Sequence, residues 1–247
     1  MNARFSGSRV LVLGGTCEIA ITLAGLMVGN SLFPILTYRD ERGRRALSES
    51  LQDLEGRYAA CFLNFGDRDS LDYLFRCIGD DFDYLVDFAQ GDLEGYIASA
   101  DEDLVCRYFM ENVAFRTEVL KRAGRIMLKN KRGRLVFISS AAAQRANPGQ
   151  GFYAAAKVAS EALYRNMGLE LGARGVTAVT LRLGYVDAGR GRVYLQGRGS
   201  QSIEKVPIRR ALTSKEVAET ILFLLSDGAS GINATEITMD GGLTAGK

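Results

Sequence analysis

The amino-acid sequence predicts an α/β protein built on a doubly wound parallel sheet of about seven strands, with helices on both faces. Three observations carry this prediction. Short apolar runs alternate with helical stretches along the whole chain, which is the pattern of parallel strands joined by crossover helices. A glycine-containing turn joins the first apolar run to the first helical stretch. The 247 residues, of which 47% are hydrophobic, suffice for one large core, and no shift in composition marks a second domain.

The composition excludes several classes of site. The chain has no histidine, which excludes Ser-His-Asp and Cys-His catalysis and every His-ligated metal site. Its four cysteines are scattered without a C-x-x-C pair, so we expect no disulfide framework and no metal. The net charge of +2 gives no reason to expect nucleic acid or an anionic membrane as partner. The N-terminus lacks the apolar region of a signal peptide, and no apolar run approaches the ~18 residues of a membrane span, so we expect a cytoplasmic protein.

The first strand is expected at 9–13, and it runs through a glycine turn into a helix over 20–28. Glycines in such a turn let the backbone approach a phosphate at the helix N-terminus. The turn keeps Gly14 and Gly15, but Glu18 stands where a full G-x-x-x-G-x-G turn has its middle glycine. Taken alone, the turn is a weak indication of a nucleotide site.

The second strand is expected at 33–38, followed by a helix over 40–54. The residue at the end of this strand meets the adenosine ribose of a bound dinucleotide, where an acid would accept from a 2′-hydroxyl. Here Tyr38 ends the strand and Arg39 follows, which suits a 2′-phosphate through a charge-assisted contact. The alternative is that Arg39 is a solvated residue at the start of the helix.

The remaining elements continue the alternation. Further strands are expected at 58–63, 83–89, 135–140, 176–183 and 234–239, and helices at 67–78, 112–129, 152–172 and from 213 onward. Residues 93–111 show no clear pattern. Residues 184–207 are rich in glycine and arginine and lack periodicity, so we expect a long functional loop there.

The pair Tyr153 and Lys157 is the strongest candidate for chemistry. Residues four positions apart on a helix share a face, so the phenol and the ammonium would point into the same space. A neighbouring cation lowers the pKa of a phenol from its usual value of ~10, which makes the pair a plausible general acid and base. Ser140 ends a strand and would face the same crevice. The alternative is that both residues lie on the exposed face of an amphipathic helix.

Taken together, these motifs resemble the short-chain dehydrogenase/reductase family, in its small single-domain branch. The resemblance covers nearly the whole chain and is strongest for Ser140, Tyr153 and Lys157, which match the Ser…Tyr-x-x-x-Lys element in identity and spacing. Further matches are the turn at 14–20, Asp87-Phe88-Ala89-Gln90 where the family has N-N-A-G, and Asn112. The C-terminal stretch from Val206 to Gly242 is similar to the 3-oxoacyl-[acyl-carrier-protein] reductases.

The resemblance implies one Rossmann-type NAD(P)-binding domain over 1–247, with a substrate-loop region at about 184–212. Tyr153 would protonate a carbonyl oxygen, and Lys157 would hold the nicotinamide ribose and lower the pKa of Tyr153. Ser140 would polarise the carbonyl, and Asn112 would help to hold a water that links Lys157 to solvent. The implied cofactor is NADPH/NADP+. The implied cofactor-binding residues are Gly14, Gly15, Thr16, Glu18, Ile19, Arg39, Asn64, Phe65, Ala89, Gln90, Tyr153, Lys157, Gly184 and Val186.

The sequence also departs from the family pattern. Glu18 adds a carboxylate near the pyrophosphate position, and Asp87, Phe88 and Gln90 change the loop beside the nicotinamide. Leu183 replaces a proline, and the nearby Ala188 falls near a threonine that often contacts the carboxamide. These changes bear on cofactor binding, whereas the four catalytic positions are kept.

The activity that follows from the resemblance is NADPH-dependent reduction of a β-ketoacyl thioester, linked to acyl carrier protein or CoA, in fatty-acid or polyketide-type synthesis. The Tyr-x-x-x-Lys spacing favours reduction of C=O, because enoyl reductases of the superfamily use Tyr-x6-Lys. Two alternatives remain open. One is a reductase or dehydrogenase of a free small ketone or alcohol, and the other is a cofactor-binding regulatory protein without turnover.

Partners are suggested by charge and by the family. Lys129, Lys131, Arg132 and Arg174 end two helices that we expect near the site mouth, where they could dock an acidic acyl carrier protein. The alternative is that cations simply favour helix C-termini. Arg190, Arg192 and Arg198 could instead meet a phosphate of phosphopantetheine or CoA. The resemblance also implies a homotetramer or homodimer formed through helices 112–130 and 152–172.

Overall fold

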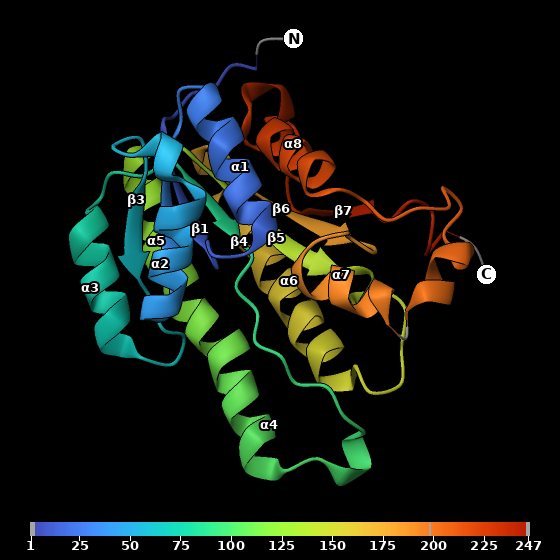
Figure 1. Ribbon diagram of the computed structural model, residues 1–247. Helices are drawn as coiled ribbons and strands as arrows, with labels where there is room; N and C mark the ends of the chain where they lie inside the picture. Colours follow the sequence, from blue (N-terminus) through green and yellow to red (C-terminus); the bar gives the residue numbers. More distant parts are fainter. Residues whose placement is uncertain (1–2, 198, 246–247) are drawn as a thin grey trace.

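The sheet explains how the chain is organised. The computed structural model describes residues 3–197 and 199–245. Seven parallel strands lie in the order β3-β2-β1-β4-β5-β6-β7 (Figure 1). The strands are β1 (Arg9–Leu13), β2 (Phe33–Tyr38), β3 (Ala59–Phe62), β4 (Tyr84–Asp87), β5 (Gly133–Ser140), β6 (Val176–Leu183) and β7 (Thr235–Met239). The prediction of a doubly wound sheet of seven strands is confirmed. The strand order reverses between β1 and β4, which is where open α/β sheets bind ligands.

Helices cover both faces of the sheet. They are α1 (Glu18–Gly29), α2 (Glu41–Ser50), α3 (Arg68–Ile78), α4 (Glu102–Phe109), α5 (Arg116–Asn130), α6 (Gly151–Leu171), α7 (Gly189–Gln196) and α8 (Ser214–Leu225). Helices α1, α2 and α8 bury side chains against one face, and α3, α5 and α6 against the other. Within the described residues, no helix has the length and apolar character needed to cross a membrane.

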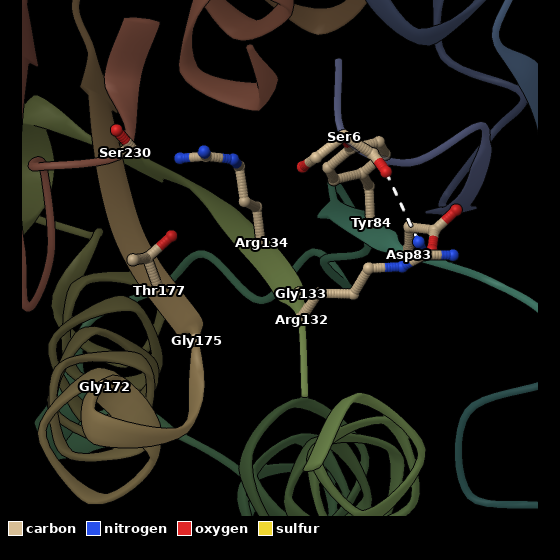
Figure 2. Close-up of a pocket in the computed structure, with 10 residues that line it drawn as sticks. All are labelled: Ser6, Asp83, Tyr84, Arg132, Gly133, Arg134, Gly172, Gly175, Thr177 and Ser230. Carbon is tan, nitrogen blue, oxygen red and sulfur yellow. Dashed lines mark hydrogen bonds and ion pairs between the residues drawn. The ribbon is translucent and has the colours of Figure 1, made fainter. Parts of the chain in front are cut away.

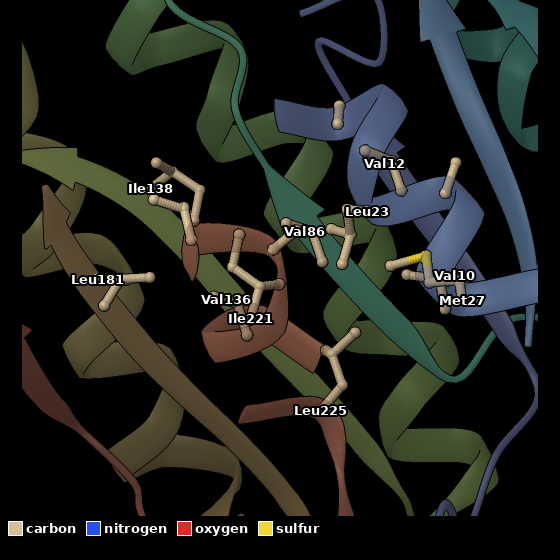
Figure 3. Close-up of a cluster of buried hydrophobic side chains, with 14 of the residues drawn as sticks. Val10, Val12, Leu23, Met27, Val86, Val136, Ile138, Leu181, Ile221 and Leu225 are labelled. Carbon is tan, nitrogen blue, oxygen red and sulfur yellow. The ribbon is translucent and has the colours of Figure 1, made fainter. Parts of the chain in front are cut away.

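The two cores follow from the alternation of side chains along each strand. Val10 and Val12 of β1 face one core, whereas Leu11 and Leu13 face the other, and all four are fully buried. Figure 3 shows the first core, in which strand residues pack against residues of α1 and α8. Because the strands are buried on both faces, they read as continuous apolar runs in the sequence.

The long helix begins ten residues earlier than predicted. Helix α4 starts at Glu102, capped by the Asp101 side chain, and continues through a π-helical stretch, Met110–Phe115, into α5. The sequence signal for α4 is weak because its apolar stripe of Val105, Tyr108 and Phe109 is short and only Tyr108 is buried. Figure 1 shows α4 extending away from the sheet.

The region expected to be a long loop, 184–207, contains regular structure. It holds α7 and a 3₁₀ turn, Ser200–Lys205. Helix α7 has no buried residue, so its sequence lacks the periodicity that would have predicted it. Arg198 lies outside the described residues. The expectation of an irregular loop is therefore wrong, although its position after β6 stands.

Candidate active site

The predicted site residues gather along one edge of the sheet. Because all seven strands are parallel, their carboxyl ends share that edge. The glycine turn follows β1, Arg39 follows β2, and Ala89 and Gln90 follow β4. The same holds for Asn64 and Phe65 after β3, Ser140 at the end of β5, and Gly184 and Val186 after β6. The topology thus brings together residues that are far apart in the sequence.

The turn after β1 needs its two glycines. Gly14 has a φ of +69°, and a Cβ there would lie 2.9 Å from the amide nitrogen of Ala89. A Cβ on Gly15 would lie 2.7 Å from the Cβ of Leu36. The Gly14 amide donates to the Thr37 hydroxyl at 3.0 Å. The turn is therefore packed directly against the neighbouring strand ends, and it leads straight into α1.

Glu18 is engaged by the segment after β6. Its carboxylate accepts from the Arg192 guanidinium at 2.8 Å, from the Ser214 hydroxyl at 3.3 Å and from the Gly189 amide at 3.4 Å. The hydrogen bond from Arg192 is the main reason that the pKa of Glu18 is lowered. The negative charge that the sequence places at this turn is therefore balanced by α7.

Arg39 lies exposed at the end of β2. Its side chain is 77% exposed and its Nε is 4.0 Å from the Asp40 carboxylate. That carboxylate caps α2 instead, accepting from the Gly43 amide at 2.8 Å. The Thr16 side chain lies close by, since a Cβ on Gly43 would be 3.0 Å from its methyl group. The position fits the predicted 2′-phosphate contact, which stays a prediction.

The other predicted cofactor residues line the same edge with varied contacts. Gln90 donates from its amide to the Tyr108 hydroxyl at 2.7 Å. The Phe65 ring packs against Phe115, with ring centroids 5.1 Å apart. A Cβ on Gly184 would lie 2.7 Å from Asp240. The Asn64 amide donates to the Ser70 hydroxyl. Ile19 packs against the hydrophobic core, and Val186 forms a β-bridge with Leu212.

Tyr153, Lys157 and Ser140 come together as predicted from their spacing. Both Tyr153 and Lys157 lie on α6, and the Lys157 ammonium is 5.7 Å from the centre of the Tyr153 ring. Lys157 is only 3% exposed, and it donates to the carbonyl of Ile138 at 2.7 Å. The Ser140 hydroxyl lies close enough to that of Tyr153 to lower its pKa. The alternative that Tyr153 and Lys157 lie on an exposed helix face is therefore excluded.

Burial, and not the neighbouring cation, decides how the pair titrates. Burial raises the pKa of Tyr153, and hydrogen bonding with Ser140 offsets only part of this effect. Burial also lowers the pKa of Lys157 to about 7, helped by repulsion from Arg116. Any lowering of the pKa of Tyr153 by Lys157 is therefore outweighed by burial in this structure. At neutral pH Tyr153 keeps its proton, whereas Lys157, with a pKa of about 7, titrates in this range.

Asn112 lies within the π-helical stretch, and its side chain and its carbonyl have partners within the protein. Its amide donates to the carbonyl of Tyr108 at 2.9 Å, and its side-chain oxygen accepts from the Gly91 amide at 2.7 Å. Its own carbonyl accepts from the guanidinium of Arg116. The predicted role of Asn112 in holding a water stays a prediction, because its amide and its carbonyl oxygens each keep capacity for a further hydrogen bond.

The sequence analysis did not identify Arg116 as a site residue, nor Asp87 as its ion-pair partner. Both side chains are fully buried, and the Arg116 Nε lies 2.7 Å from an oxygen of Asp87. A signal was available, because Arg116 falls three and four residues before Val119 and Leu120 on the buried stripe of the long helix. A charged residue at such a position needs a buried partner.

The predicted docking cluster lies at the wrong end of the sheet. Lys129, Lys131 and Arg132 directly precede β5, and Arg174 precedes β6, whereas Ser140 ends β5. Lys129 pairs with Asp80 and Arg132 with Asp83, each at 2.7 Å. A pocket of about 210 Å³ opens among these amino ends, where Figure 2 shows Arg132 turned toward Asp83 and Arg134 toward Ser230. The expectation that the cluster borders the site mouth of its own chain is wrong.

Known proteins resemble the chain over almost its whole length. The sequence model of a family described as "Enoyl-(Acyl carrier protein) reductase" matches residues 18–244. The 3-oxoacyl-[acyl-carrier-protein] reductase FabG of Haemophilus influenzae is 28% identical over 240 residues, which cover 96% of this chain and 98% of that protein. A solved short chain dehydrogenase/reductase family protein has a TM-score of 0.88 and 27% identity, with full coverage of both chains. An actinorhodin polyketide ketoreductase variant with NADPH has a TM-score of 0.88 at 22% identity, covering 98% of this chain and 99% of that one, a likeness of fold alone.

Proposed function

The chain belongs to the short-chain dehydrogenase/reductase family, and from this premise we propose that it is an NADPH-dependent ketoreductase of a β-ketoacyl thioester. The thioester is carried by an acyl carrier protein or by CoA, in fatty-acid or polyketide-type synthesis. Family membership makes the protein an oxidoreductase that acts on C=O and CH–OH groups. We propose NADPH as the cofactor and a β-ketoacyl thioester as the substrate.

The observation that carries the proposal is the arrangement of Ser140, Tyr153 and Lys157 at the carboxyl edge of the sheet. Tyr153, with its raised pKa, keeps its proton at neutral pH and can give it to a carbonyl oxygen. The Ser140 hydroxyl, beside that of Tyr153, stabilises the negative charge that develops on this oxygen. Lys157, whose pKa is about 7, can hold and release a proton in the pH range of the cell.

The residues present fit a nicotinamide dinucleotide. The turn at Gly14 and Gly15 leaves room for nothing larger than hydrogen and leads into the N-terminus of α1, which attracts phosphate. Arg39 supports NADPH over NADH, because its exposed guanidinium lies at the end of β2. NADPH, when bound, supplies the hydride.

The choice of a ketone over an enoyl substrate rests on the spacing of the catalytic pair. The matching family model is described by an enoyl reductase name, but Tyr153 and Lys157 are separated by three residues here. The thioester part of the proposal is supported by FabG of Haemophilus influenzae, which is named for a 3-oxoacyl-[acyl-carrier-protein] substrate.

The test is oxidation of NADPH with short β-ketoacyl thioesters, with the matching free ketones and with NADH run beside them. We expect turnover of the thioester with NADPH. Tyr153→Phe should lose at least about 100-fold in kcat, since it removes the proton donor, whereas the exposed Tyr73→Phe should match the wild type. Arg39→Gln should raise the KM for NADPH about 10- to 100-fold without changing that for NADH. Equal rates with the free ketone would contradict the thioester assignment, and cofactor binding without turnover of any substrate would favour a regulatory protein.

We also propose that two copies associate through α5 and α6. Leu128 of α5 and Val158 and Leu169 of α6 are exposed apolar residues on these helices. Light scattering after gel filtration tests this proposal. A monomer at micromolar concentration would contradict it.

A further inference from the structure

Arg116 has an unusual environment for a charged residue. It is 0% exposed and lies at the first position of α5, directly after the π-helical stretch. Its guanidinium donates to the Asp87 carboxylate at 2.7 Å, to the Ser160 hydroxyl at 3.0 Å and to the carbonyls of Asn112 and Ala89. Nearly all of its hydrogen-bonding capacity is thus used inside the protein.

These contacts join three separate parts of the site. Asp87 and Ala89 belong to the end of β4 and its loop, Asn112 to the π-helical stretch, and Ser160 to α6, the helix of Tyr153 and Lys157. Asp87 is tied down in turn, because it accepts from the Ala89 amide at 2.9 Å and from the Tyr164 hydroxyl at 2.9 Å. Arg116 is the one described side chain that bonds to all three parts.

We propose that Arg116 is a positioning residue of the active site, which acts with Asp87 to hold the Asn112 backbone and the loop after β4 in place beside Lys157. This inference rests on the proposed function for its kinetic consequence, but its structural content does not depend on the substrate. It also accounts for Asp87, which stands where the resemblance leads one to expect an asparagine. The carboxylate is there because a buried guanidinium needs a countercharge.

Arg116 also lies close enough to Lys157 to influence its charge. The guanidinium and the ammonium lie 5.2 Å and 4.8 Å from the centre of the same Phe137 ring. Arg116 therefore lowers the pKa of Lys157, and Asp87 raises it. Arg190 of α7 lowers it further and Glu161 of α6 raises it, while Glu161 is itself paired with Arg182. The two members of the buried pair thus act on Lys157 with opposite signs.

This opposition gives a test that needs no substrate. The pKa of Lys157 is measured by NMR on protein labelled with ¹³C-lysine, and the signal is assigned by its loss in Lys157→Met. Arg116→Met should raise this pKa by about one unit and Asp87→Asn should lower it by about one unit. A residue that only fills space would behave differently. Its loss would admit water and raise the pKa of Lys157 toward its ordinary value in both variants, and that result would overturn the electrostatic part of the proposal.

Positioning is tested separately from charge. Arg116→Lys keeps the charge but cannot make the same set of hydrogen bonds, so the pKa of Lys157 should change little while kcat falls about 10- to 100-fold. Arg122→Met is the matched control, because Arg122 also lies on α5, pairs with Asp72 at 2.5 Å and stands 5.6 Å from the Phe75 ring, but far along the helix from Asn112. It should leave both quantities unchanged. Wild-type kcat in Arg116→Lys would overturn the positioning role.

A single charge change can prevent folding, so the double variant Asp87→Asn/Arg116→Met completes the set. It removes both buried charges, and it should fold with the pKa of Lys157 within about half a unit of the wild type. Its kcat should still be about 10- to 100-fold lower, because the Asn112 carbonyl and the loop after β4 have lost their anchor. A double variant with wild-type kcat would overturn the proposal. Failure of every variant and of the wild type to reduce a thioester would instead count against the proposed function, and the NMR result would still stand.

Discussion

Two carboxylate–arginine pairs invite comparison, because their geometry is alike and their surroundings are not. Asp87 and Arg116 approach to 2.7 Å and are 0% exposed, whereas Glu18 and Arg192 approach to 2.8 Å and are each 41% exposed. Both carboxylates stand where the resemblance leads one to expect an uncharged residue. In each case an arginine from a distant part of the chain forms an ion pair with the added carboxylate.

The difference teaches that distance alone does not tell what an ion pair does. Around Glu18 and Arg192, water can replace either partner, so the contact can open at small cost. Asp87 and Arg116 are fully buried, so bulk water cannot replace either partner, and loss of one leaves the other charge unpaired. The pair of Glu18 and Arg192 therefore forms a contact between α1 and α7 that can open. The pair of Asp87 and Arg116 forms a contact that stays closed.

The largest effect is expected from breaking the buried pair. Arg116→Met leaves Asp87 charged and without its ionic partner, so the free energy of unfolding should fall by about 3–5 kcal/mol. Arg192→Met should cost less than about 1 kcal/mol. Urea denaturation of the two variants measures both values. Equal losses would show that burial does not separate the two pairs, and a loss that persists unchanged in Asp87→Asn/Arg116→Met would point to lost packing instead of an unpaired charge.

A smaller effect concerns how stability depends on pH. Burial lowers the pKa of Lys157 from its ordinary value of 10.5 to about 7, so between these values the folded protein binds fewer protons than the unfolded chain. The free energy of unfolding therefore rises with pH, by about 2 kcal/mol from pH 7 to pH 9 relative to Lys157→Met. The raised pKa of Tyr153 acts in the opposite direction only above its ordinary range near pH 10.

Denaturation curves at several pH values for the wild type and Lys157→Met measure this difference. Glu18→Gln serves as the control from the exposed region, because its carboxylate is ionised throughout this range and its curve should run parallel to the wild type. Parallel curves for Lys157→Met and the wild type would mean that Lys157 is charged in the folded protein at neutral pH.

The smallest effect is expected from salt. Raising NaCl from about 0.05 to about 0.5 M should remove most of the stability difference between the wild type and Arg192→Gln, because salt screens exposed charges. The difference between the wild type and Arg116→Met should hardly change. Thermal unfolding at both salt concentrations gives the comparison. A salt-independent effect of Arg192→Gln would place its pair with Glu18 among the fixed contacts.

Much of the fold and the position of the site could be predicted because parallel strands are buried on both faces. Their apolar runs are continuous, and their carboxyl ends meet at one edge, so Ser140 and the turn at Gly14 could be brought together from the sequence alone. Helices α4 and α7 were missed because they bury almost no side chains. The docking cluster could have been placed correctly, since Arg132 directly precedes a strand whose other end carries Ser140.

The electrostatics of the site could not be predicted in the same way. Spacing on α6 shows that Tyr153 and Lys157 share a face, but the depth of that face depends on everything packed over it. The desolvation that governs both pKa values is a property of the folded protein. For Arg116, the sequence pattern could predict a position on the buried stripe of the long helix. It could not predict which groups Arg116 would contact there.

The contact of α8 with α1 has a consequence for the newly made chain. Helix α1 is synthesised well before α8, yet they pack side by side over the same face of the sheet (Figure 1). Strand β1 likewise lacks one of its two neighbouring strands until β4 has been synthesised, since Val10 pairs with Tyr84. On the ribosome, part of the apolar face of the early strands therefore remains uncovered until α8 has been translated. A chain interrupted before Ser214 should present this surface to chaperones, so a premature stop there should yield an aggregating product and not a smaller folded domain.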